Sequence, residues 1–260
     1  MEFDERLRFV FGEPAAVVRA DGKSRLVVGD LHIGMEQRII REGIKVYDAT
    51  NKMAKSLTHI AKEFGCKSII ILGDVKESIL YPDAQEQKMI SGFFSELSHY
   101  EVSITKGNHD PHIEEIIPKD VSVFDELVVE DFAFLHGHRW PTKEALDCDY
   151  IFTGHNHAAI RLMDKNKGIY AQKVWLISKI NAKEAGKKYE TFNMECRLVT
   201  APSFNPLILG TPVNRTLPDS ENINPLYRNK VFPYRRAEIY GIEGDTLGVV
   251  GRLPAHNAQY

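Results

Sequence analysis

Five short apolar runs in this chain each end in side chains that can bind a metal ion or move a proton. Each run has the length and composition of a β-strand, and a glycine lies within or beside each ending. The five endings, in chain order, are Gly29-Asp30-Leu31-His32, Gly73-Asp74, Gly107-Asn108-His109-Asp110, His136-Gly137-His138 and Gly154-His155-Asn156-His157. One such ending alone is a weak signal, because short combinations of this kind occur by chance. Their recurrence predicts one site assembled from five separate loops.

The strand-like runs alternate with segments of helical periodicity as far as His157. Helices are expected from about Asp48 to Phe64 and over Gln85–Ser98. Ser68–Leu72 is rich in isoleucine, which is typical of a central strand buried on both faces. Further strands are expected at Ala15–Arg19 and Leu26–Gly29, paired as a hairpin, and at Val102–Thr105, Val121–Val129, Phe132–Leu135 and Tyr150–Gly154. This alternation predicts a layered α/β fold.

Beyond His157 the pattern becomes β-rich. Strands are expected at Ala159–Met163, Val174–Ile180 and Met194–Thr200, and a closing hairpin from Ala237–Tyr240 and Thr246–Arg252. The prolines around Ala201–Pro206 interrupt regular structure. No stretch has the composition of a linker, so residues 1–260 are expected to form a single domain, with a motif-bearing core over 15–160 and a β-rich part over 161–260.

The charge of the chain excludes a global basic field, because the net charge is −3. Two segments are nevertheless locally basic. Residues 161–188 hold eight Lys or Arg against two acids, and Leu226–Arg236 holds four Arg or Lys and no acid, interleaved with Tyr227, Phe232 and Tyr234. Such segments are either solvated surface or a contact surface for a phosphate backbone.

The hydrophobic content of 43% is ordinary for a water-soluble globular protein. The three cysteines, Cys66, Cys148 and Cys196, form no disulfide or zinc-binding spacing, and they are expected to be reduced thiols. The N-terminus has no signal-peptide pattern, and no apolar run approaches the ~20 residues of a membrane-spanning helix. We therefore expect a cytoplasmic protein without a membrane partner.

A pair of divalent cations, about 3.5–4 Å apart, needs a carboxylate shared between them and nitrogen or oxygen ligands on either flank. The order of the five endings supplies such a set. It resembles the calcineurin-like metallophosphoesterase superfamily, whose five sequence blocks it matches from Asp30 to His157. The resemblance implies a four-layer α/β/β/α sandwich of the metallophosphoesterase type, with two metals at the C-terminal ends of its strands.

The resemblance also implies roles for individual residues. Asp30, His32, Asp74 and His157 would bind the first metal, and Asp74, Asn108, His136 and His155 the second. The mixed ligand set favours Mn²⁺, with Fe, Zn²⁺, Ni²⁺ and Mg²⁺ as alternatives. A hydroxide bridging the metals would attack phosphorus, and His109 would protonate the departing oxygen, with Asp110 as the orienting partner of its ring. His138 would support a ligand or contact the substrate, or it is an exposed loop histidine.

Within the superfamily, the blocks Gly29–Gly34, Gly73–Glu77 and Ala201–Pro206 look most like the stand-alone branch related to the SbcD repair nucleases. The chain departs from those nucleases where Val75-Lys76-Glu77 replaces a histidine, and it has no room for their capping domain, so a processive DNA-end exonuclease is not expected.

The expected function is a phosphodiesterase or nuclease acting on DNA or RNA. The alternative is a hydrolase of small nucleotides or other soluble phosphoesters. A non-catalytic binding module and a phosphoprotein phosphatase are less favoured. A homodimer and a DNA-processing helicase partner are implied by the family resemblance only.

Overall fold

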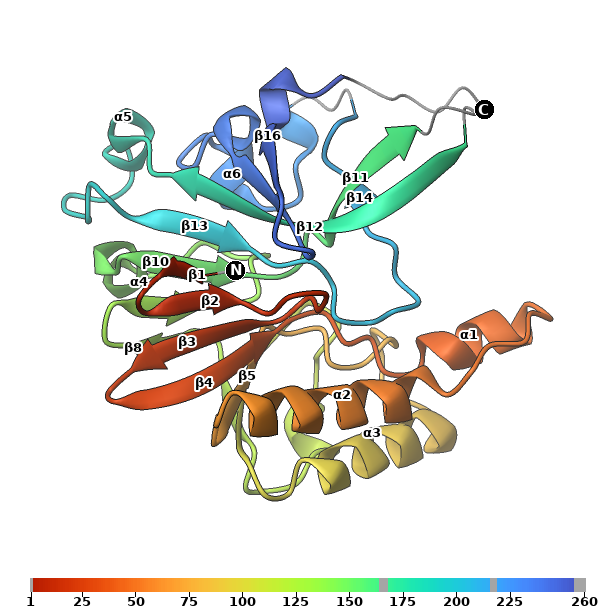
Figure 1. The fold of residues 1–260 in the computed structure, drawn as a ribbon. Coiled ribbons are helices and arrows are strands. Elements are labelled where there is room, and N and C mark those ends of the chain that lie inside the picture. The colour runs from red at the N-terminus through yellow and green to blue at the C-terminus, as the bar shows by residue number, and fades with distance from the viewer. Residues whose placement is uncertain (1, 164–167, 216–218, 255–260) are drawn as a thin grey trace.

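The computed structural model describes residues 2–163, 168–215 and 219–254, and two large β-sheets form its centre (Figure 1). The first sheet is built from β1 (Glu2–Asp4), β2 (Leu7–Phe9), β3 (Ala16–Ala20), β4 (Lys23–Val28), β5 (Ser68–Ile71), β6 (Glu101–Thr105) and β7 (Ser122–Phe124), in that spatial order. Neighbouring strands are antiparallel from β1 to β4 and parallel from β4 to β7.

The second sheet has the spatial order β14-β11-β12-β13-β10-β9-β8. Its strands are β8 (Leu127–Val129), β9 (Phe132–Phe134), β10 (Tyr150–Thr153), β11 (Ala158–Met163), β12 (Ile169–Lys179), β13 (Arg197–Thr200) and β14 (Thr211–Pro212). A hairpin of β15 (Glu238–Gly241) and β16 (Thr246–Val249) extends it from β12. Because β9, β10 and β13 run parallel, their carboxyl ends lie at one edge.

Helices α2 (Ala49–Glu63) and α3 (Ala84–Glu96) cover the outer face of the first sheet, and α4 (Lys143–Asp147), α5 (Ala182–Ala185) and α6 (Pro225–Arg228) cover that of the second. The short helix α1 (Met35–Arg41) follows the loop after β4 and buries only Glu36 among its described residues. Short 3₁₀ turns lie at Ile113–Glu115, Asp219–Glu221, Tyr234–Arg236 and Val250–Arg252. The carboxylates of Asp48 and Asp83 accept backbone hydrogen bonds at the starts of α2 and α3, which stabilises both helices.

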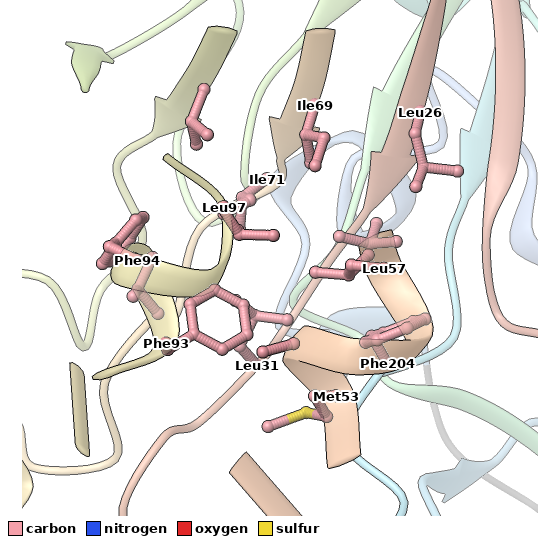
Figure 2. Close-up of a cluster of buried hydrophobic side chains, with 14 of the residues drawn as sticks. Leu26, Leu31, Met53, Leu57, Ile69, Ile71, Phe93, Phe94, Leu97 and Phe204 are labelled. Atoms are coloured by element: carbon pink, nitrogen blue, oxygen red, sulfur yellow. The ribbon is translucent and has the colours of Figure 1, made fainter. Parts of the chain in front are cut away.

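The alternation of side chains along the central strands separates the apolar cores, three of which include residues of β5, β9, β10 or β13. Ile69 and Ile71 of β5 point toward α2 and α3, where Figure 2 shows them with Leu57 and Phe93. Ile70 points the other way, into the core between the two sheets, which also contains Phe134, Phe152 and Trp175. The third core packs residues of β9, β10 and β13 beneath α4, α5 and α6. The order helix, sheet, sheet, helix confirms the predicted four-layer α/β/β/α fold.

Some elements of the structure differ from the expectations or were not expected. The run Val121–Val129 is not one strand: β7 joins the first sheet, and β8 crosses to the second and pairs with β9. β12 begins at Ile169, before the expected Val174, because its first residues pair with β11. β1 and β2 form an additional hairpin beside β3. Each of these strands has three residues, which is too short for hydrophobic periodicity to predict a strand. Within the described residues, no helix combines the length and apolar character needed to cross a membrane.

Candidate metal centre

The loops that follow β4, β5, β6, β9 and β10 bring the predicted ligands together at one edge of the two sheets. The loop after β4 pairs with the loop after β5, since the amide of His32 donates to the carbonyl of Asp74 at 2.8 Å. The amide of His155, after β10, donates to the carboxylate of Asp30 at 3.0 Å and so joins the second sheet to the first.

The first group of converging side chains is Asp30, His32, Asp74 and His157, whose ligand atoms all lie within 4.8 Å of one another. Nε2 of His157 lies 3.2 Å from Nε2 of His32 and 3.5 Å from Oδ1 of Asp30. Nε2 of His32 lies 3.6 Å from Oδ2 of Asp74. These are the four residues expected for the first metal.

The second group is Asp74, His136 and His155. Nε2 of His136 lies 3.1 Å from Nδ1 of His155, 3.3 Å from Oδ2 of Asp74 and 3.1 Å from Oδ1 of Asn108. Asp74 Oδ2 thus lies within 4 Å of an imidazole nitrogen from each group. One carboxylate oxygen occupies the position that a bridging ligand requires.

The donor set fits divalent cations, because carboxylate oxygens, an amide oxygen and imidazole nitrogens, all of which can act as ligand atoms, converge at one place. Nδ1 of His136 lies 2.8 Å from the carbonyl oxygen of Leu72, which can only accept, so Nδ1 carries the proton. In the neutral ring, Nε2 then presents its lone pair toward the oxygens of Asp74 and Asn108. His32 is oriented in the same way, since its Nδ1 donates to the Glu77 carboxylate at 3.0 Å. A cation among these atoms removes the repulsion between them.

The pKa of His136 reflects the negative charge of the carboxylates that surround its ring. Burial disfavours the imidazolium, but the carboxylates of Asp74 and Asp30 outweigh burial and raise the pKa of His136 to about 9. Burial opposes ionisation of Asp74 as well, yet His136 and His32 hold the pKa of this carboxyl well below its usual range. A site that favours a proton on a buried imidazole is one in which a metal cation is also favoured.

Glycines at the strand ends leave room for the ligand carboxylates. A Cβ on Gly107 would lie 2.2 Å from Oδ1 of Asp74, and a Cβ on Gly154 would lie 2.8 Å from Oδ2 of Asp30. Any side chain at these two positions would displace a ligand. The glycines of the sequence pattern therefore serve the close approach of the loops.

Five of the predicted ligand residues adopt left-handed backbone conformations. Their φ angles are 55° at Asp30, 42° at His32, 48° at Asp74, 67° at His155 and 45° at His157. Each such non-glycine residue costs of order 1–3 kcal/mol and persists only where its surroundings enforce it. The strain is concentrated in the loops that aim the ligands, which is typical of a functional site.

His109 lies beside the first group, with its ring centroid 4.8 Å from that of His32. Its backbone amide donates to Oδ1 of Asp74 at 2.8 Å, so this residue also holds the shared carboxylate. The ring contacts the carbonyl oxygen of Glu77 through Nδ1 at 2.7 Å. This contact orients the ring, a role that the sequence assigned to Asp110.

Asp110 is fully buried, and its carboxylate faces the backbone instead. It accepts hydrogen bonds from the amides of Val75 and Gly107, each at 2.9 Å. The expected contact between Asp110 and the His109 ring is thus replaced by a structural one, which ties the Asp74 loop to the Gly107 turn. The carboxylate turns away because two adjacent loops present amides that only an acceptor can satisfy.

His138 lies behind the second group, with its ring centroid 6.1 Å from that of His155. Its Nδ1 is buried and has no hydrogen-bond partner among the described residues. Burial and the neighbouring His136 lower the pKa of His138 to about 4. The residue is therefore half-buried beside the site and not an exposed loop histidine.

Glu77 contributes to the site although the sequence signalled it only as a departure from a family pattern. Its carboxylate accepts from His32 at 3.0 Å and from Nη1 of Arg38 at 2.8 Å. Glu77 also forms a third possible ligand group with His32 and His109. Since His32 turns Nε2 toward the first group, Glu77 orients a ligand from behind.

Two of the three aromatic rings in the locally basic segment Leu226–Arg236 do not reach the surface, while Tyr234 is half-buried. Tyr227 and Phe232 are fully buried in the core beneath α6. These rings cannot stack on bases, whereas Arg228 and Arg235 remain exposed.

Comparisons with known proteins found a family model and solved structures that are similar to this chain. The family model described as calcineurin-like phosphoesterase matches residues 24–159, more than half of the chain. No curated protein matches the chain significantly. Among solved structures, the nuclease MPE of Pseudomonas putida is similar with a TM-score of 0.54 and 16% identity, covering 88% of this chain and 97% of that one. YfcE, a phosphoesterase from E. coli, has a TM-score of 0.33 and 14% identity over 54% of this chain and 73% of its own.

Proposed function

This chain belongs to the calcineurin-like phosphoesterase family, and from that premise we propose that it is a phosphodiesterase that cleaves nucleic acid with the help of two divalent cations, Mn²⁺ foremost. The observation that carries the proposal is the position of Asp74 Oδ2, within 4 Å of an imidazole nitrogen of both His32 and His136. Asp30 and His157 complete one ligand set, and Asn108 and His155 complete the other.

Two bound cations would supply positive charge for a phosphoryl group and lower the pKa of a water molecule. The reaction forms one bond from a water oxygen to phosphorus and breaks one ester bond, and the departing oxygen takes up a proton. His109 is the residue of this chain best placed to give that proton, because its ring lies beside His32 and is held by the Glu77 carbonyl. Asp74 keeps the two ligand groups together and accepts the amide of His109.

The preference for a diester of nucleic acid is supported by the Pseudomonas putida protein of the same fold, which is a nuclease. It is further supported by the partly buried position of the site between loops, which include half-buried His155 and His157 beside exposed Asn108. A long phosphodiester chain can reach a site of this depth from the surface.

The decisive experiment compares hydrolysis of bis-p-nitrophenyl phosphate with that of p-nitrophenyl phosphate, on protein stripped of metal and reloaded with Mn²⁺. We expect preference for the diester, followed by Mn²⁺-dependent cleavage of labelled single-stranded DNA or RNA. Asp74→Asn should lose at least about a hundredfold in kcat, because it removes the shared negative charge. Preference for the monoester would instead identify a phosphatase of small soluble phosphoesters and contradict the proposal.

A further inference from the structure

A groove of about 450 Å³ lies beside the candidate metal centre, along α1. We call it the Leu80 groove. Its lining comes from α1 with the residue before it, from the segment that leads into α3 and the start of α3, and from His109. The lining residues are Gly34, Gln37, Arg38, Arg41, Glu77, Ser78, Ile79, Leu80, Asp83, Glu86 and His109.

Each arginine of the Leu80 groove is paired with a carboxylate. Arg38 pairs with Glu77 at 2.8 Å, and Arg41 pairs with Asp83 at 2.5 Å. The Glu86 carboxylate accepts the backbone amides of Glu77 and Ser78. An uncharged group can therefore bind in the groove without breaking either ion pair.

Two apolar side chains of the groove, those of Ile79 and Leu80, are exposed to solvent. Ile79 is 57% exposed and Leu80 is 82% exposed. Below them, the buried ammonium of Lys76 donates to the backbone carbonyls of Ser78, Ile79 and Leu80. These bonds draw the backbone inward and leave the side chains outward. An apolar edge that is built in this way, next to a reaction centre, indicates a binding surface.

The polar groups of the groove could recognise a planar heterocycle. The guanidinium groups of Arg38 and Arg41 are flat and can stack on a ring, and the amide of Gln37 offers both a donor and an acceptor. Single-stranded nucleic acids are bound by this combination of stacking surfaces and edge contacts.

We infer that the Leu80 groove binds the nucleobase of the leaving nucleoside of a phosphodiester substrate. The inference rests on the proposed function. It adds that the groove holds the part of the substrate that leaves when the ester bond is broken. His109 belongs to both the groove and the reaction centre, so the group that departs beside His109 lies in the groove. The oxygen that receives the proton then belongs to the nucleoside whose base contacts Leu80.

The test uses two dinucleoside monophosphates that differ only on the leaving side, where one has a normal base and the other an abasic sugar. Equilibrium binding and kcat/KM are measured with Mn²⁺-loaded wild-type protein, Leu80→Ala and Met194→Ala. Met194 is a matched control, since it is 62% exposed and does not line the groove.

We expect wild-type protein to bind and cleave the base-bearing substrate about tenfold better than the abasic one. Leu80→Ala should remove most of this preference by raising KM for the base-bearing substrate, with unchanged metal content, and Met194→Ala should retain it. Equal affinity and kcat/KM of the wild-type protein for both substrates would overturn the inference. So would a decrease in kcat/KM in Leu80→Ala that is equal for both substrates. A change in oligomeric state without a kinetic change would likewise overturn it, by assigning Leu80 to a protein contact.

The inference and the proposed function fail in different ways. If neither dinucleotide is hydrolysed, but the wild-type protein binds the base-bearing one more tightly and Leu80→Ala abolishes the difference, the groove assignment stands and the proposed reaction does not. If both are hydrolysed at equal efficiency, the reaction stands and the groove assignment is wrong.

Discussion

The hydroxyl of Ser203 donates a 2.8 Å hydrogen bond to the backbone carbonyl of Asp30, a residue 173 positions earlier in the chain. The amide of Phe204 donates to the carbonyl of Gly29, and the side-chain amide of Asn205 donates to the carbonyls of Leu31 and His32. The segment after β13 thereby holds the loop that carries Asp30 and His32, two of the predicted ligands of the first metal. Both Asp30 and His32 have left-handed backbones, which these contacts help to maintain.

Asn205→Ala is expected to weaken metal binding more than it weakens the fold. Its side chain is buried, and its loss removes the donor to the carbonyl of Leu31 and one of two donors to the carbonyl of His32, which also accepts the amide of Met35, at a cost of about 1–3 kcal/mol. The Asp30–His32 loop should relax, and Mn²⁺ affinity should fall about 10- to 100-fold, as for other residues that support ligands. Metal titration and thermal unfolding measure the two effects.

Asn229→Ala serves as the control for Asn205→Ala, because its side-chain amide also donates to a backbone carbonyl, that of Pro225 at the start of α6. Metal affinity should be unchanged in this variant. Equal metal affinities in Asn205→Ala and the wild-type protein would show that the Asp30–His32 loop keeps its shape without the clamp.

His109→Ala should keep both metals and lose turnover. The bond that holds Asp74 comes from the backbone amide of residue 109, which alanine retains. Removal of the ring removes the proton donor, and general acid catalysis contributes typically ~10²–10⁴-fold to a rate. Metal content by mass spectrometry and kcat for a diester with a poor leaving group are the measurements. A variant that has lost its metals would assign His109 to ligand binding.

Asp110→Asn should destabilise the protein and leave the acid step intact. Both carboxylate oxygens of Asp110 accept backbone amides, and an asparagine would turn an NH₂ group toward one of these donors. An unsatisfied buried donor costs about 1–3 kcal/mol, which urea denaturation resolves. Asp125→Asn, at an exposed position, is the control and should unfold like the wild-type protein. Unchanged stability with a strongly altered pH dependence of kcat would restore the catalytic role predicted for Asp110.

Lys173 makes stability depend on pH above 8. Its ammonium donates to the carbonyls of Ser203 and Asn205, and burial lowers its pKa from 10.5 to about 8. The unfolded chain therefore binds more protons between pH 8 and 10.5, so this group's contribution to stability rises as pH increases through that window. Between pH 8 and 10.5, the free energy of unfolding of the wild-type protein should therefore rise by up to about 3 kcal/mol relative to that of Lys173→Met.

The measurement for Lys173 is urea denaturation of both proteins at pH 7, 9 and 10. Lys62→Met, on the exposed face of α2, is the control and should differ from the wild-type protein by a constant amount. A difference between the wild-type protein and Lys173→Met that also stays constant would mean that Lys173 keeps its ordinary pKa in the folded state.

Much of the fold could be predicted because burial produces local periodicity. Ser68–Leu72 has the composition of a strand buried on both faces, and β5 lies between the α2–α3 core and the inter-sheet core. The periodicity of 48–64 predicted α2 within one residue of its ends. The prediction from periodicity was wrong at Val121–Val129, where the β-like pattern continues while the chain passes from the first sheet to the second. Alternation of apolar and polar residues shows which side chains share a face of a strand, but it does not show which strands lie beside it.

The sequence alone determined the chemistry of the centre: imidazoles, carboxylates and an amide at five strand ends, with glycines at the points of close approach. These follow from residue types and from their place after apolar runs, which are local properties. Only the tertiary structure decided that Glu77 orients His32, that Asp110 satisfies the backbone, and that Ser203 and Asn205 hold the Asp30–His32 loop. Such pairings depend on which loops the two sheets bring together, and a hydrogen bond between residues more than 170 positions apart leaves no periodic trace in the chain.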